Sequence, residues 1–531
     1  MKEIKAEVCV YQIVSVEQMR ALEHEADSRG LSYAQMMENA GKAAATLINQ
    51  RFGKRKGKSI VGLVGSGNNG GDALVALNQL QCQGWDTHAY LIKERKEHDL
   101  LVEQYLAGGG NVDRFSNDEN HSLLDNLTKH CHFLLDGIFG TGVRLPLRGE
   151  IEEVLQHLRD AEKLPYIIAL DCPSGVDCDS GEADVAAVHA QWTISMAAVK
   201  RGLLEFPAFE HVGELSVVEI GLPADLEAWK GGREFCMDES AAAAMLPARP
   251  VQAHKGTFGT AVIFAGSRAY PGAAYLAAKA AYLAGAGLVT LASIAEVRQA
   301  IAGTLPEATW YLLQTQDEGF GWDETTSLPA VLQKASAILA GPGWGTHPSA
   351  AILLERLFDI MKENPRTPLI IDADGLNLLS QHVELFKKLP ANCILTPHPG
   401  EMARLSGLAV EEIQKDRQTI ARTYAKKWNA TLVLKGALTV IADPCGRLVV
   451  NPVATPALAK AGSGDVLAGM LAGLAAQGID GLDAACMACW MHGRAGMLAE
   501  RAVGHSASVM ASDILRSIPW VFRILLKRKA G

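Results

Sequence analysis

Residues 460–470 read Lys-Ala-Gly-Ser-Gly-Asp-Val-Leu-Ala-Gly-Met, a glycine-rich turn that leads directly into an apolar helical run. The glycines let the backbone bend tightly beside a ligand, and the free N–H groups at the start of the following helix attract an anion. Asp465 would repel that anion. Its carboxylate suits a different task, which is to take a proton from a hydroxyl beside a bound polyphosphate. The alternative interpretation is an ordinary glycine-rich turn in which Asp465 caps the helix.

The pattern around this turn is repeated through the second half of the chain. Apolar strand-like runs end in polar or glycine-rich loops that lead into helical runs; the strand-like runs lie at 260–264, 288–292, 337–340, 368–374, 393–396 and 431–434. This alternation predicts an α/β fold with a mostly parallel sheet between two layers of helices. The P-loop pattern G-x-x-x-x-G-K-[ST] is absent, so the expected phosphate site is of another kind.

The first half of the chain shows the same alternation. The apolar run 60–64 leads into residues 65–72, Gly-Ser-Gly-Asn-Asn-Gly-Gly-Asp, after which a helical run resumes. The spacing matches the dinucleotide fingerprint G-x-G-x-x-G, which is a weak signal when it stands alone. Asn68, Asn69 and Asp72 add side-chain oxygens, which are unusual in a loop that binds only a pyrophosphate.

Two further strands of the first half end in loops with oxygen-bearing side chains. Asp136 ends one apolar run, and Asp171 ends the next, shortly before Ser174. The carboxyl ends of parallel strands meet at one edge of a sheet, where open α/β sheets bind their ligands. Asn69, Asp136 and Ser174 could therefore offer oxygens to one cation, and such a set favours an alkali or alkaline-earth ion over zinc. Each of these residues alone could also be an ordinary loop cap.

The length of 531 residues exceeds what one ordinary core accommodates, so two or more domains are expected. A Gly-Gly pair at 231–232 and the polar run after it separate the halves, and we predict domains at 1–235 and 236–531. The net charge of −9 argues against nucleic acid as a partner, and no apolar run is long enough to span a membrane.

Ten cysteines are scattered without the rhythm of a disulfide framework, which predicts a cytoplasmic protein. Cys486 and Cys489 form a C-x-x-C motif followed by His492, inside an alanine- and methionine-rich helical run. A zinc site would need a second ligand pair, so these residues are expected to belong to the buried core.

Three motifs of the first half, at 67–72, 136–142 and 171–175, together resemble the YjeF N-terminal family of NAD(P)H-hydrate epimerases. The resemblance covers roughly residues 10–225 and implies a Rossmann-like domain. It implies that Asp171 faces the reacting nicotinamide ring as an acid/base, and that Asn69, Asp136 and Ser174 hold a potassium ion. It also implies a set of residues around the hydrated dinucleotide: Asn68, Asn69, Gly70, Gly71, Asp72, Gly140, Thr141, Gly142, Val143, Arg144, Leu145, Pro146 and Asp171.

The second half resembles the ribokinase-like superfamily through the loop 435–439, Lys-Gly-Ala-Leu-Thr, and the turn 462–465. Within that superfamily it is similar to the YjeF C-terminal family of ADP-dependent NAD(P)H-hydrate dehydratases, on motifs at 254–259, 341–343, 372–377 and 396–401. The resemblance implies an adenine nucleotide bound by Lys435, Gly436, Ala437, Leu438, Thr439 and Gly464. It implies a hydrate bound by Ala273, Gly343, His398 and Asp465, with Asp465 as the base. Taken alone, Lys435 could be a solvated strand-end lysine and His398 an ordinary turn residue.

Together the two resemblances imply a bifunctional enzyme that repairs NADHX and NADPHX, the hydrates of NADH and NADPH. One half would interconvert the R and S forms, and the other would dehydrate the S form at the expense of ADP or ATP, with Mg²⁺ on the phosphates. Asp372 and Asp374 are candidate magnesium ligands, although such a pair at a strand end is as often structural. We also expect a homo-oligomer, since many proteins of this fold form symmetric assemblies.

Three other interpretations stay open on the sequence alone. The Gly-Ser-Gly-Asp turn also occurs in phosphotransferases, so the chain could be a ribokinase-like small-molecule kinase with a regulatory Rossmann-like domain. The first half could be a non-enzymatic dinucleotide or RNA-processing scaffold, although the presence of Asn69, Asp72, Asp136 and Asp171 speaks against this. An ordinary NAD dehydrogenase is weakened by the lack of an obvious hydride-acceptor site.

Overall fold

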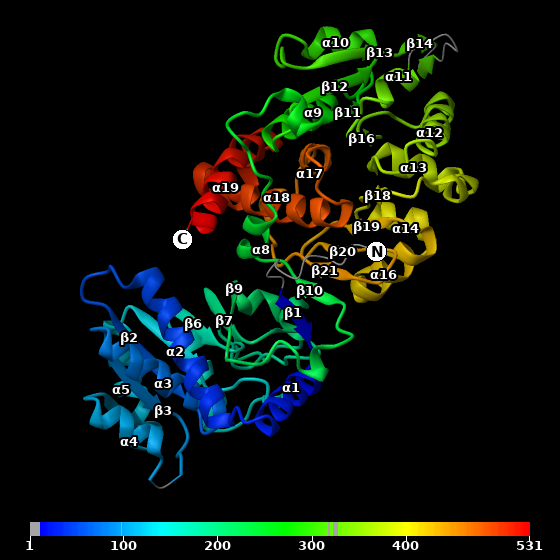
Figure 1. Cartoon of the computed structure of the whole chain (residues 1–531). Helices are drawn as coiled ribbons and strands as arrows, with labels where there is room; N and C mark the ends of the chain where they lie inside the picture. The colour runs from blue at the N-terminus through cyan, green and yellow to red at the C-terminus, as the bar shows by residue number, and fades with distance from the viewer. Residues whose placement is uncertain (1–10, 97, 317–318, 322–327, 531) are drawn as a thin grey trace. The chain divides into compact units, whose positions relative to one another are not determined.

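The computed structural model describes residues 11–96, 98–316, 319–321 and 328–530. Within these residues the chain forms two compact units, 11–232 and 233–530, and the division directly follows the Gly-Gly pair at 231–232. Each unit is built on a sheet that carries helices (Figure 1). Among the described helices, none is long and apolar enough to cross a membrane.

A parallel sheet of seven strands forms the centre of the N-terminal unit, in the order β4-β3-β2-β5-β6-β7-β9. The chain winds outward in one direction from β2 to β4 and in the other direction from β5 to β9, so the strand order reverses between β2 and β5. In open parallel sheets such a reversal leaves a crevice at the carboxyl ends of the two strands. The strands are β2 (Ser59–Val64), β3 (Asp86–Leu91), β4 (Asn111–Arg114), β5 (Phe133–Gly137), β6 (Tyr166–Leu170), β7 (Trp192–Met196) and β9 (Glu214–Val218); β1 (Tyr11–Val14) and β8 (Val199–Lys200) form a short parallel pair.

Helices cover both faces of this sheet because side chains along each strand alternate between two apolar cores. In β2, Ile60 and Val64 belong to the core under α1 to α4, whereas Val61 and Leu63 belong to the core under α5 and α6. This arrangement confirms the predicted three-layer, Rossmann-like architecture. The helices are α1 (Val16–Ser28), α2 (Tyr33–Phe52), α3 (Asn68–Cys82), α4 (Leu100–Ala107), α5 (Ser122–His130), α6 (Glu150–Asp160) and α7 (Phe209–Val212).

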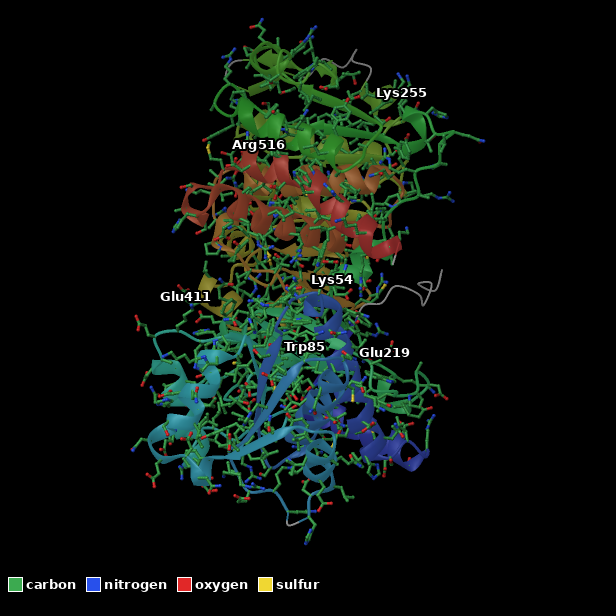
Figure 2. The ribbon with its side chains drawn as sticks, turned by 90° about the vertical axis from the view of Figure 1, so that its left-hand side faces the viewer. Lys54, Trp85, Glu219, Lys255, Glu411 and Arg516 are labelled. Carbon is green, nitrogen blue, oxygen red and sulfur yellow. The ribbon has the colours of Figure 1, made fainter. Side chains whose placement is uncertain are left out.

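An aromatic cluster fixes α2 against the sheet. Phe52 at the end of α2 packs on Phe133 of β5 with ring centroids 4.6 Å apart, and Trp85 lies 5.5 Å from the same ring. The side chain of Trp85 is labelled in Figure 2. It is only 3% exposed, and its indole N–H donates to Asn49 Oδ1 at 2.9 Å. The ammonium group of Lys58 lies 5.4 Å from the Trp85 ring and donates to two backbone carbonyls. Lys58 is therefore a lysine with a purely structural environment.

Helix α3 begins at Asn68, earlier than the sequence predicted, so residues 68–72 form its first turns instead of a loop. Gly70 and Gly71 are weak helix formers, but tertiary packing requires them here. A Cβ on Gly70 would lie 2.0 Å from the Gly65 carbonyl oxygen, and one on Gly71 would lie 2.5 Å from Met37 Sδ. The glycines that suggested a flexible phosphate loop thus serve the close packing of a helix end.

The sheet of the C-terminal unit has the order β13-β12-β11-β16-β17-β18-β19-β20-β21-β10. The pairs from β13 to β19 are all parallel, as predicted, whereas β19, β20 and β21 are joined antiparallel. Its strands are β10 (Glu234–Cys236), β11 (Thr260–Phe264), β12 (Leu288–Ser293), β13 (Thr309–Leu312), β16 (Ala337–Ala340), β17 (Leu369–Ile371), β18 (Cys393–Leu395), β19 (Thr431–Leu434), β20 (Val440–Ala442) and β21 (Leu448–Val450); β14 (Gln314–Gln316) and β15 (Gly319–Gly321) form a separate antiparallel pair.

Helices of the C-terminal unit again lie on both sides of the strands (Figure 1), which confirms the predicted ribokinase-like three-layer architecture. Helices α9 and α17 pack closely against each other. A Cβ on Gly469 would lie 2.1 Å from Ala277 O, and one on Gly473 would lie 2.4 Å from Ala281 O. The helices are α8 (Glu239–Ala244), α9 (Pro271–Leu283), α10 (Ala295–Ile301), α11 (Leu328–Leu332), α12 (Pro348–Met361), α13 (Asp374–Gln381), α14 (Pro399–Ser406), α15 (Val410–Lys415), α16 (Arg417–Trp428), α17 (Ser463–Ala476), α18 (Gly481–Val503) and α19 (Ala511–Ala530).

Candidate active sites

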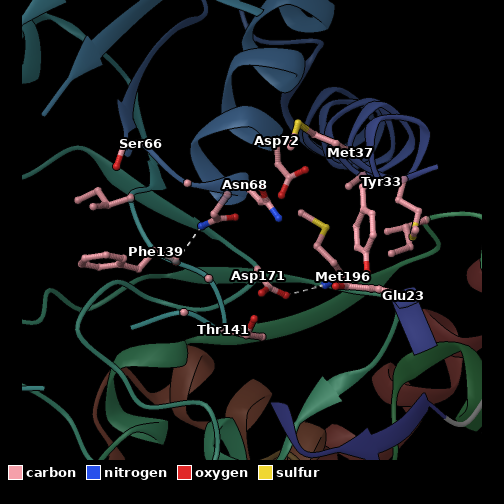
Figure 3. Close-up of a pocket in the computed structure, with 18 of the residues that line it drawn as sticks. Glu23, Tyr33, Met37, Ser66, Asn68, Asp72, Phe139, Thr141, Asp171 and Met196 are labelled. Atoms are coloured by element: carbon pink, nitrogen blue, oxygen red, sulfur yellow. Dashed lines mark hydrogen bonds between the residues drawn. The ribbon is translucent and has the colours of Figure 1, made fainter. Parts of the chain in front are cut away.

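A cavity of about 520 Å³ lies in the N-terminal unit, at the ends of β2, β5 and β6 and the start of α3 (Figure 3). It is the crevice that the reversed strand order creates. Residues 143–146, Gly70 and Gly71 are not part of its lining; Val143 packs into the core under α5 and α6. The predicted residues that do line the cavity are Asn68, Asn69, Asp72, Gly140, Thr141, Gly142 and Asp171.

Asp171 lies at the floor of this cavity, directly after β6, with a backbone φ of 63°. A left-handed backbone is uncommon for a residue with a side chain, and such residues often occur at functional sites. Its Oδ1 atom accepts hydrogen bonds from the Lys200 ammonium group and from the Met196 N–H at 3.3 Å. Its Oδ2 atom faces Gly140, where an added Cβ would lie 2.8 Å away. One oxygen of the carboxyl group thus accepts two hydrogen bonds, and the other faces the cavity wall at Gly140.

Lys200, which the sequence analysis missed, is the partner that holds Asp171. It ends the short strand β8, lines the cavity and is 1% exposed. Besides Asp171, its ammonium group donates to Met196 O at 2.8 Å, Ser195 Oγ at 3.2 Å and Ala198 O at 3.3 Å. A lysine at the end of the apolar run 196–199 is the signal that could have identified it, since a lysine is seldom buried unless it is paired.

Two more carboxyl groups line the same cavity, Asp72 from α3 and Glu23 from α1 (Figure 3). Burial and the charges of Asp171 and Glu23 raise the pKa of Asp72 well above its ordinary value. Burial and the charge of Asp171 likewise raise the pKa of Glu23. The cavity therefore combines carboxyl groups that favour the protonated form with a carboxylate that is paired to a lysine, which is the arrangement of an acid/base site.

Asn69 lines the cavity, and Phe139 links it to the buried pair Asp136 and Ser174, which are not part of the lining. Asn69 donates from Nδ2 to Phe139 O at 2.8 Å and to Leu170 O at 3.0 Å, and its Oδ1 is buried without a hydrogen-bond partner. Asp136 is fully buried and accepts from the Ser174 hydroxyl at 2.5 Å and the Ser174 N–H at 2.8 Å. A buried oxygen without a donor suits a cation ligand. Within the described residues, no group of three or more His, Cys, Asp or Glu side chains has the arrangement of a metal site.

In the C-terminal unit, Asp465 lies in the first turn of α17. The N-cap is Gly462, with φ of 85°, and no side chain caps the helix, so the alternative in which Asp465 is the cap is wrong. The first-turn N–H groups are therefore available to an anion. Burial and the charge of Asp372, offset in part by Lys435, raise the pKa of Asp465 to about 7. A carboxyl group with this pKa can act as a general base near neutral pH.

Lys435 joins Asp465 to a network of buried carboxyl groups. Its ammonium group donates to Asp372 Oδ1 at 2.6 Å and lies 3.7 Å from Glu401 Oε2. Asp372 also accepts from Thr396 Oγ1 at 2.7 Å. Burial, with Asp372 adding to it and Lys435 opposing it, raises the pKa of Glu401 to about 7. Lys435 is thus an enclosed, paired lysine and not a solvated strand-end lysine.

The parallel packing of α9 on α17 brings the predicted hydrate-binding residues together. Gly469 faces Ala277 and Gly473 faces Ala281, so the same register one turn earlier places Ala273 alongside Asp465. A Cβ on Gly343 would lie 2.8 Å from the Ala273 Cβ. Gly343 therefore adjoins Ala273, and the register of α9 on α17 puts Ala273 at the level of Asp465, although the three residues are far apart in sequence.

His398 and the loop 435–439 complete the surroundings of Lys435. His398 caps α14 by accepting from Gly400 N–H at 3.0 Å; burial and the charge of Lys435 lower its pKa. The loop turns tightly, with Thr439 Oγ1 donating to Gly436 O at 2.9 Å. Leu438 is 4% exposed, so a nucleotide in this loop would meet its backbone and not its side chain. In the first turn of α17, a Cβ on Gly464 would lie 3.6 Å from Lys435 Nζ.

Cys486 and Cys489 lie buried in α18 as free thiols, which confirms their predicted place in the core. His492, one turn further along α18, has a closer link to the site than the sequence suggested. Its Nε2 atom lies 3.2 Å from the hydroxyl of Ser463, the first residue of α17. Burial lowers the pKa of His492 to about 4, so the ring is neutral and supports the turn by this hydrogen bond.

Comparisons with known proteins match both halves of the chain. The YjeF-related protein N-terminus family matches residues 33–202, and the NAD(P)H-hydrate dehydratase family matches residues 261–520. The chain is 35% identical over 496 residues to a bifunctional NAD(P)H-hydrate repair enzyme of Moorella thermoacetica, covering 92% of either chain. It is 37% identical over 512 residues to the enzyme of that name from Salinibacter ruber, covering 93% of this chain and 92% of the relative.

A solved structure, the ADP/ATP-dependent NAD(P)H-hydrate dehydratase from Bacillus subtilis co-crystallised with ATP and Mg²⁺, is 32% identical. The match covers 54% of this chain and 97% of that chain, with a TM-score of 0.45.

The fold and the two sites define a two-domain α/β enzyme with one Rossmann-like and one ribokinase-like domain. The sequence comparisons then assign the family: the chain belongs to the bifunctional NAD(P)H-hydrate repair enzymes.

Proposed function

We propose that the N-terminal unit interconverts the R and S forms of NADHX and NADPHX, and that the C-terminal unit dehydrates the S form at the expense of ADP or ATP. The observation that carries the proposal is the Asp465 carboxyl group, which has a pKa of about 7 at an uncapped helix start in the network of Lys435. The family names of the relatives favour this function over a ribokinase-like small-molecule kinase.

The dehydration follows from the groups around Asp465. Hydroxide is a poor leaving group, so water is not readily lost from C6 of the hydrate until the hydroxyl is phosphorylated. Asp465 takes the hydroxyl proton while the oxygen attacks the terminal phosphorus of ADP or ATP, whose bond to the bridging oxygen breaks and releases AMP or ADP; the first-turn N–H groups of α17 and Lys435 hold the phosphate charge. The C6–O bond of the phosphate ester then breaks and releases inorganic phosphate, a proton leaves C5 to the solvent, and the reduced nicotinamide ring is restored.

We place the expected magnesium ion at two carboxyl groups of the same network. Asp372, Glu401 and Asp465 lie around the ammonium group of Lys435, and burial, with Asp372 adding to it and Lys435 opposing it, raises the pKa of Glu401 and of Asp465 to about 7. Asp374 accepts through both oxygens, from Gly345 N–H at 2.7 Å (Oδ2) and from Asn377 Nδ2 at 3.1 Å (Oδ1), whereas Asp372 accepts from Lys435 and Thr396 through Oδ1. Asp372 and Glu401 would therefore hold the ion, which would neutralise charge on the nucleotide phosphates.

In the N-terminal unit, epimerisation needs an acid and a base on opposite faces of C6. Asp72 projects into the cavity from α3, and Asp171 lies across the cavity from it (Figure 3). Asp72, whose pKa is raised mainly by burial, would protonate the departing hydroxyl, which leaves as water. Asp171 would then take a proton from the water molecule that adds to the opposite face. The product is the other epimer, and solvent exchange resets the two carboxyl groups.

Potassium fits the set formed by Asn69, Asp136 and Ser174, because the buried Oδ1 of Asn69 has no other partner. The ion would offset the buried charge of Asp136 and fix the start of α3. We expect K⁺ to raise the thermal midpoint of the chain by about 2–4 °C over Na⁺ or tetramethylammonium at equal ionic strength, and to raise the epimerisation rate. The measurement is calorimetry in each chloride salt. Equal midpoints in all three salts would contradict a potassium site.

The first experiment on the proposed function is recovery of the reduced-nicotinamide absorbance at 340 nm from a mixture of R and S hydrates. The protein is supplied with ADP or ATP, Mg²⁺ and K⁺. Recovery from both epimers supports the two activities, whereas a stable phosphorylated product would favour the kinase. Comparison of the two nucleotides at equal concentration identifies the phosphoryl donor. The cytoplasmic location and the homo-oligomer stay predictions; size-exclusion chromatography with light scattering tests the latter.

Dehydration should depend on pH through Asp465. Because its pKa is raised to about 7, the carboxylate that accepts the proton is the major form only above that pH. We expect kcat/KM for the S hydrate to fall about tenfold for each pH unit below 7 and to level off above 8. Initial rates across this range at saturating nucleotide provide the test. A rate that is independent of pH below 7 would argue against Asp465 as the base.

A further inference from the structure

Lys200 and Asp171 form a buried ion pair in which the ammonium group also donates to three other acceptors. We propose that Lys200 is the positioning residue of the epimerase site: it holds the Oδ1 atom of Asp171 as its counter-charge and directs the Oδ2 atom at the hydrate. This inference rests on the proposed epimerisation and adds to it a residue with a defined task.

The hydrogen bonds around Lys200 fix the position of its ammonium group. An ammonium group has three protons, and four acceptors surround this one: Asp171 Oδ1, Ser195 Oγ and the carbonyls of Met196 and Ala198. At 1% exposure, the side chain cannot exchange these partners for water. A buried ammonium group is costly unless it is paired and fully hydrogen-bonded, which is the case here. Its position is therefore set by the fold.

The pair leaves the two oxygens of Asp171 with different roles. Oδ1 takes the Lys200 ammonium group and the Met196 N–H, while Oδ2 faces Gly140 at the cavity wall. The left-handed backbone at Asp171 is not the local preference of an aspartate, so the position of this carboxylate depends on the contacts that hold it. Lys200 thus fixes one oxygen and leaves the other to the substrate.

The surrounding charges show why Asp171 needs a cation. Asp72 approaches from α3, Glu23 and Arg20 from α1, and the thiol of Cys172 adjoins Asp171 in the chain; Lys200 is the cation bonded to Asp171. Burial and the charge of Asp171 raise the pKa values of Asp72 and Glu23. Without Lys200, Asp171 would face Asp72 and Glu23 without the cation that is bonded to it.

Lys200→Met tests this role, with Lys58→Met as the matched control. Lys58 is also largely enclosed and bonds two carbonyls in the same unit, but it contacts Trp85 and not the cavity. We measure kcat/KM for conversion of the R hydrate between about pH 5.5 and 9, coupled to the chain's own dehydration of the S form. For Lys200→Met we expect kcat/KM at pH 7 to fall about 100-fold. We also expect the pH below which kcat/KM declines, the acid limb of the pH profile, to move up by about one unit or more. For Lys58→Met we expect a lower thermal midpoint and the pH profile of the unmodified protein.

Gly140→Ala is a second variant that separates position from charge. Its added methyl group would press on Oδ2 and leave Lys200 in place, so kcat/KM should fall without a shift of the acid limb. Dehydration of pure S hydrate, which uses the other unit, reports folding in every variant. If Lys200→Met lowers the rate equally at all pH values, or not at all, the inference is overturned. If the unmodified protein dehydrates S hydrate but never converts R hydrate, the proposed epimerisation fails instead.

Discussion

Asp465→Asn is expected to lower nucleotide-dependent dehydration of the S hydrate by about 10²–10⁴-fold, because the amide cannot take the hydroxyl proton. The substitution keeps the size of the side chain and the open first turn of α17, so nucleotide binding should remain. The measurement is the rate of recovery at 340 nm from pure S hydrate with saturating nucleotide and Mg²⁺. Epimerisation of the R form, followed by chromatography of the two hydrates, should be unchanged.

The same variant should be more stable than the unmodified protein at alkaline pH. The folded-state pKa of about 7 lies above that of an aspartate in the unfolded chain, so folding favours the protonated form. The stability that Asp465 contributes is present below about pH 4 and is lost as the pH rises through 7. We expect Asp465→Asn to raise the free energy of unfolding by about 2 kcal/mol at pH 8 and by little at pH 4. Denaturant titrations at both pH values provide the measurement.

Asp483→Asn is the matched control for Asp465→Asn. Asp483 also lies in the first turn of a helix, α18, and burial also raises its pKa, but it is not part of the Lys435 network. It should show a gain in stability at pH 8 without a loss of dehydration. A comparable loss of activity in both variants would mean that the rate depends on helix stability and not on the base. Full activity of Asp465→Asn would reject the proposed role.

Asp171→Asn is expected to abolish conversion of the R hydrate while dehydration of the S form continues. An R/S mixture should then recover only the absorbance of its S fraction, and the R form should stay behind. The reason is that an amide can still accept the hydrogen bonds of Lys200 and Met196 but cannot accept a proton from water. We expect a loss of about 10²–10⁴-fold in kcat/KM for the R form, measured by chromatography of the residual hydrate.

The fold of Asp171→Asn must be checked, because the variant leaves Lys200 buried without its counter-charge. Removing one partner of a buried pair costs about 3–5 kcal/mol, and the retained amide oxygen should reduce this cost. Asp113→Asn serves as the control, since Asp113 lies in β4 and pairs with the His88 side chain at 2.9 Å, away from the cavity. Full R conversion by Asp113→Asn and none by Asp171→Asn is the expected pair of results. Normal conversion by Asp171→Asn would contradict its role as the base.

The layered fold could be predicted because its signals are local. Apolar runs such as 60–64 and 260–264 coincide with β2 and β11 to within one residue, since buried strands require such runs and their loops require polar or small residues. The start of α3 could not be predicted, because Gly70 and Gly71 oppose a helix locally. Their contacts with Gly65 and Met37 make the helix start there. Strands β20 and β21 also escaped prediction; they are the strands that pair antiparallel, next to β19.

The candidate sites were predictable where one loop carries the signal and not where distant segments meet. Asp465, Lys435 and Asp171 each follow a recognisable strand or turn pattern. Lys200 is separated from Asp171 by 29 residues, and Glu23 comes from a helix with an ordinary amphipathic pattern. Nothing in the residues around either position shows which carboxyl group it will meet.

The sequence by itself determined the two α/β units, the loops that bear functional side chains and the family to which the chain belongs. The reason is that strand, turn and motif patterns depend on near neighbours in the chain. Only the tertiary structure decided which carboxyl groups hold protons. Packing buries Asp72 beside Asp171, joins Asp171 to Lys200 and encloses Asp465 with Asp372 and Lys435. Protonation depends on burial and on charges only a few ångströms away, and folding alone brings those charges together.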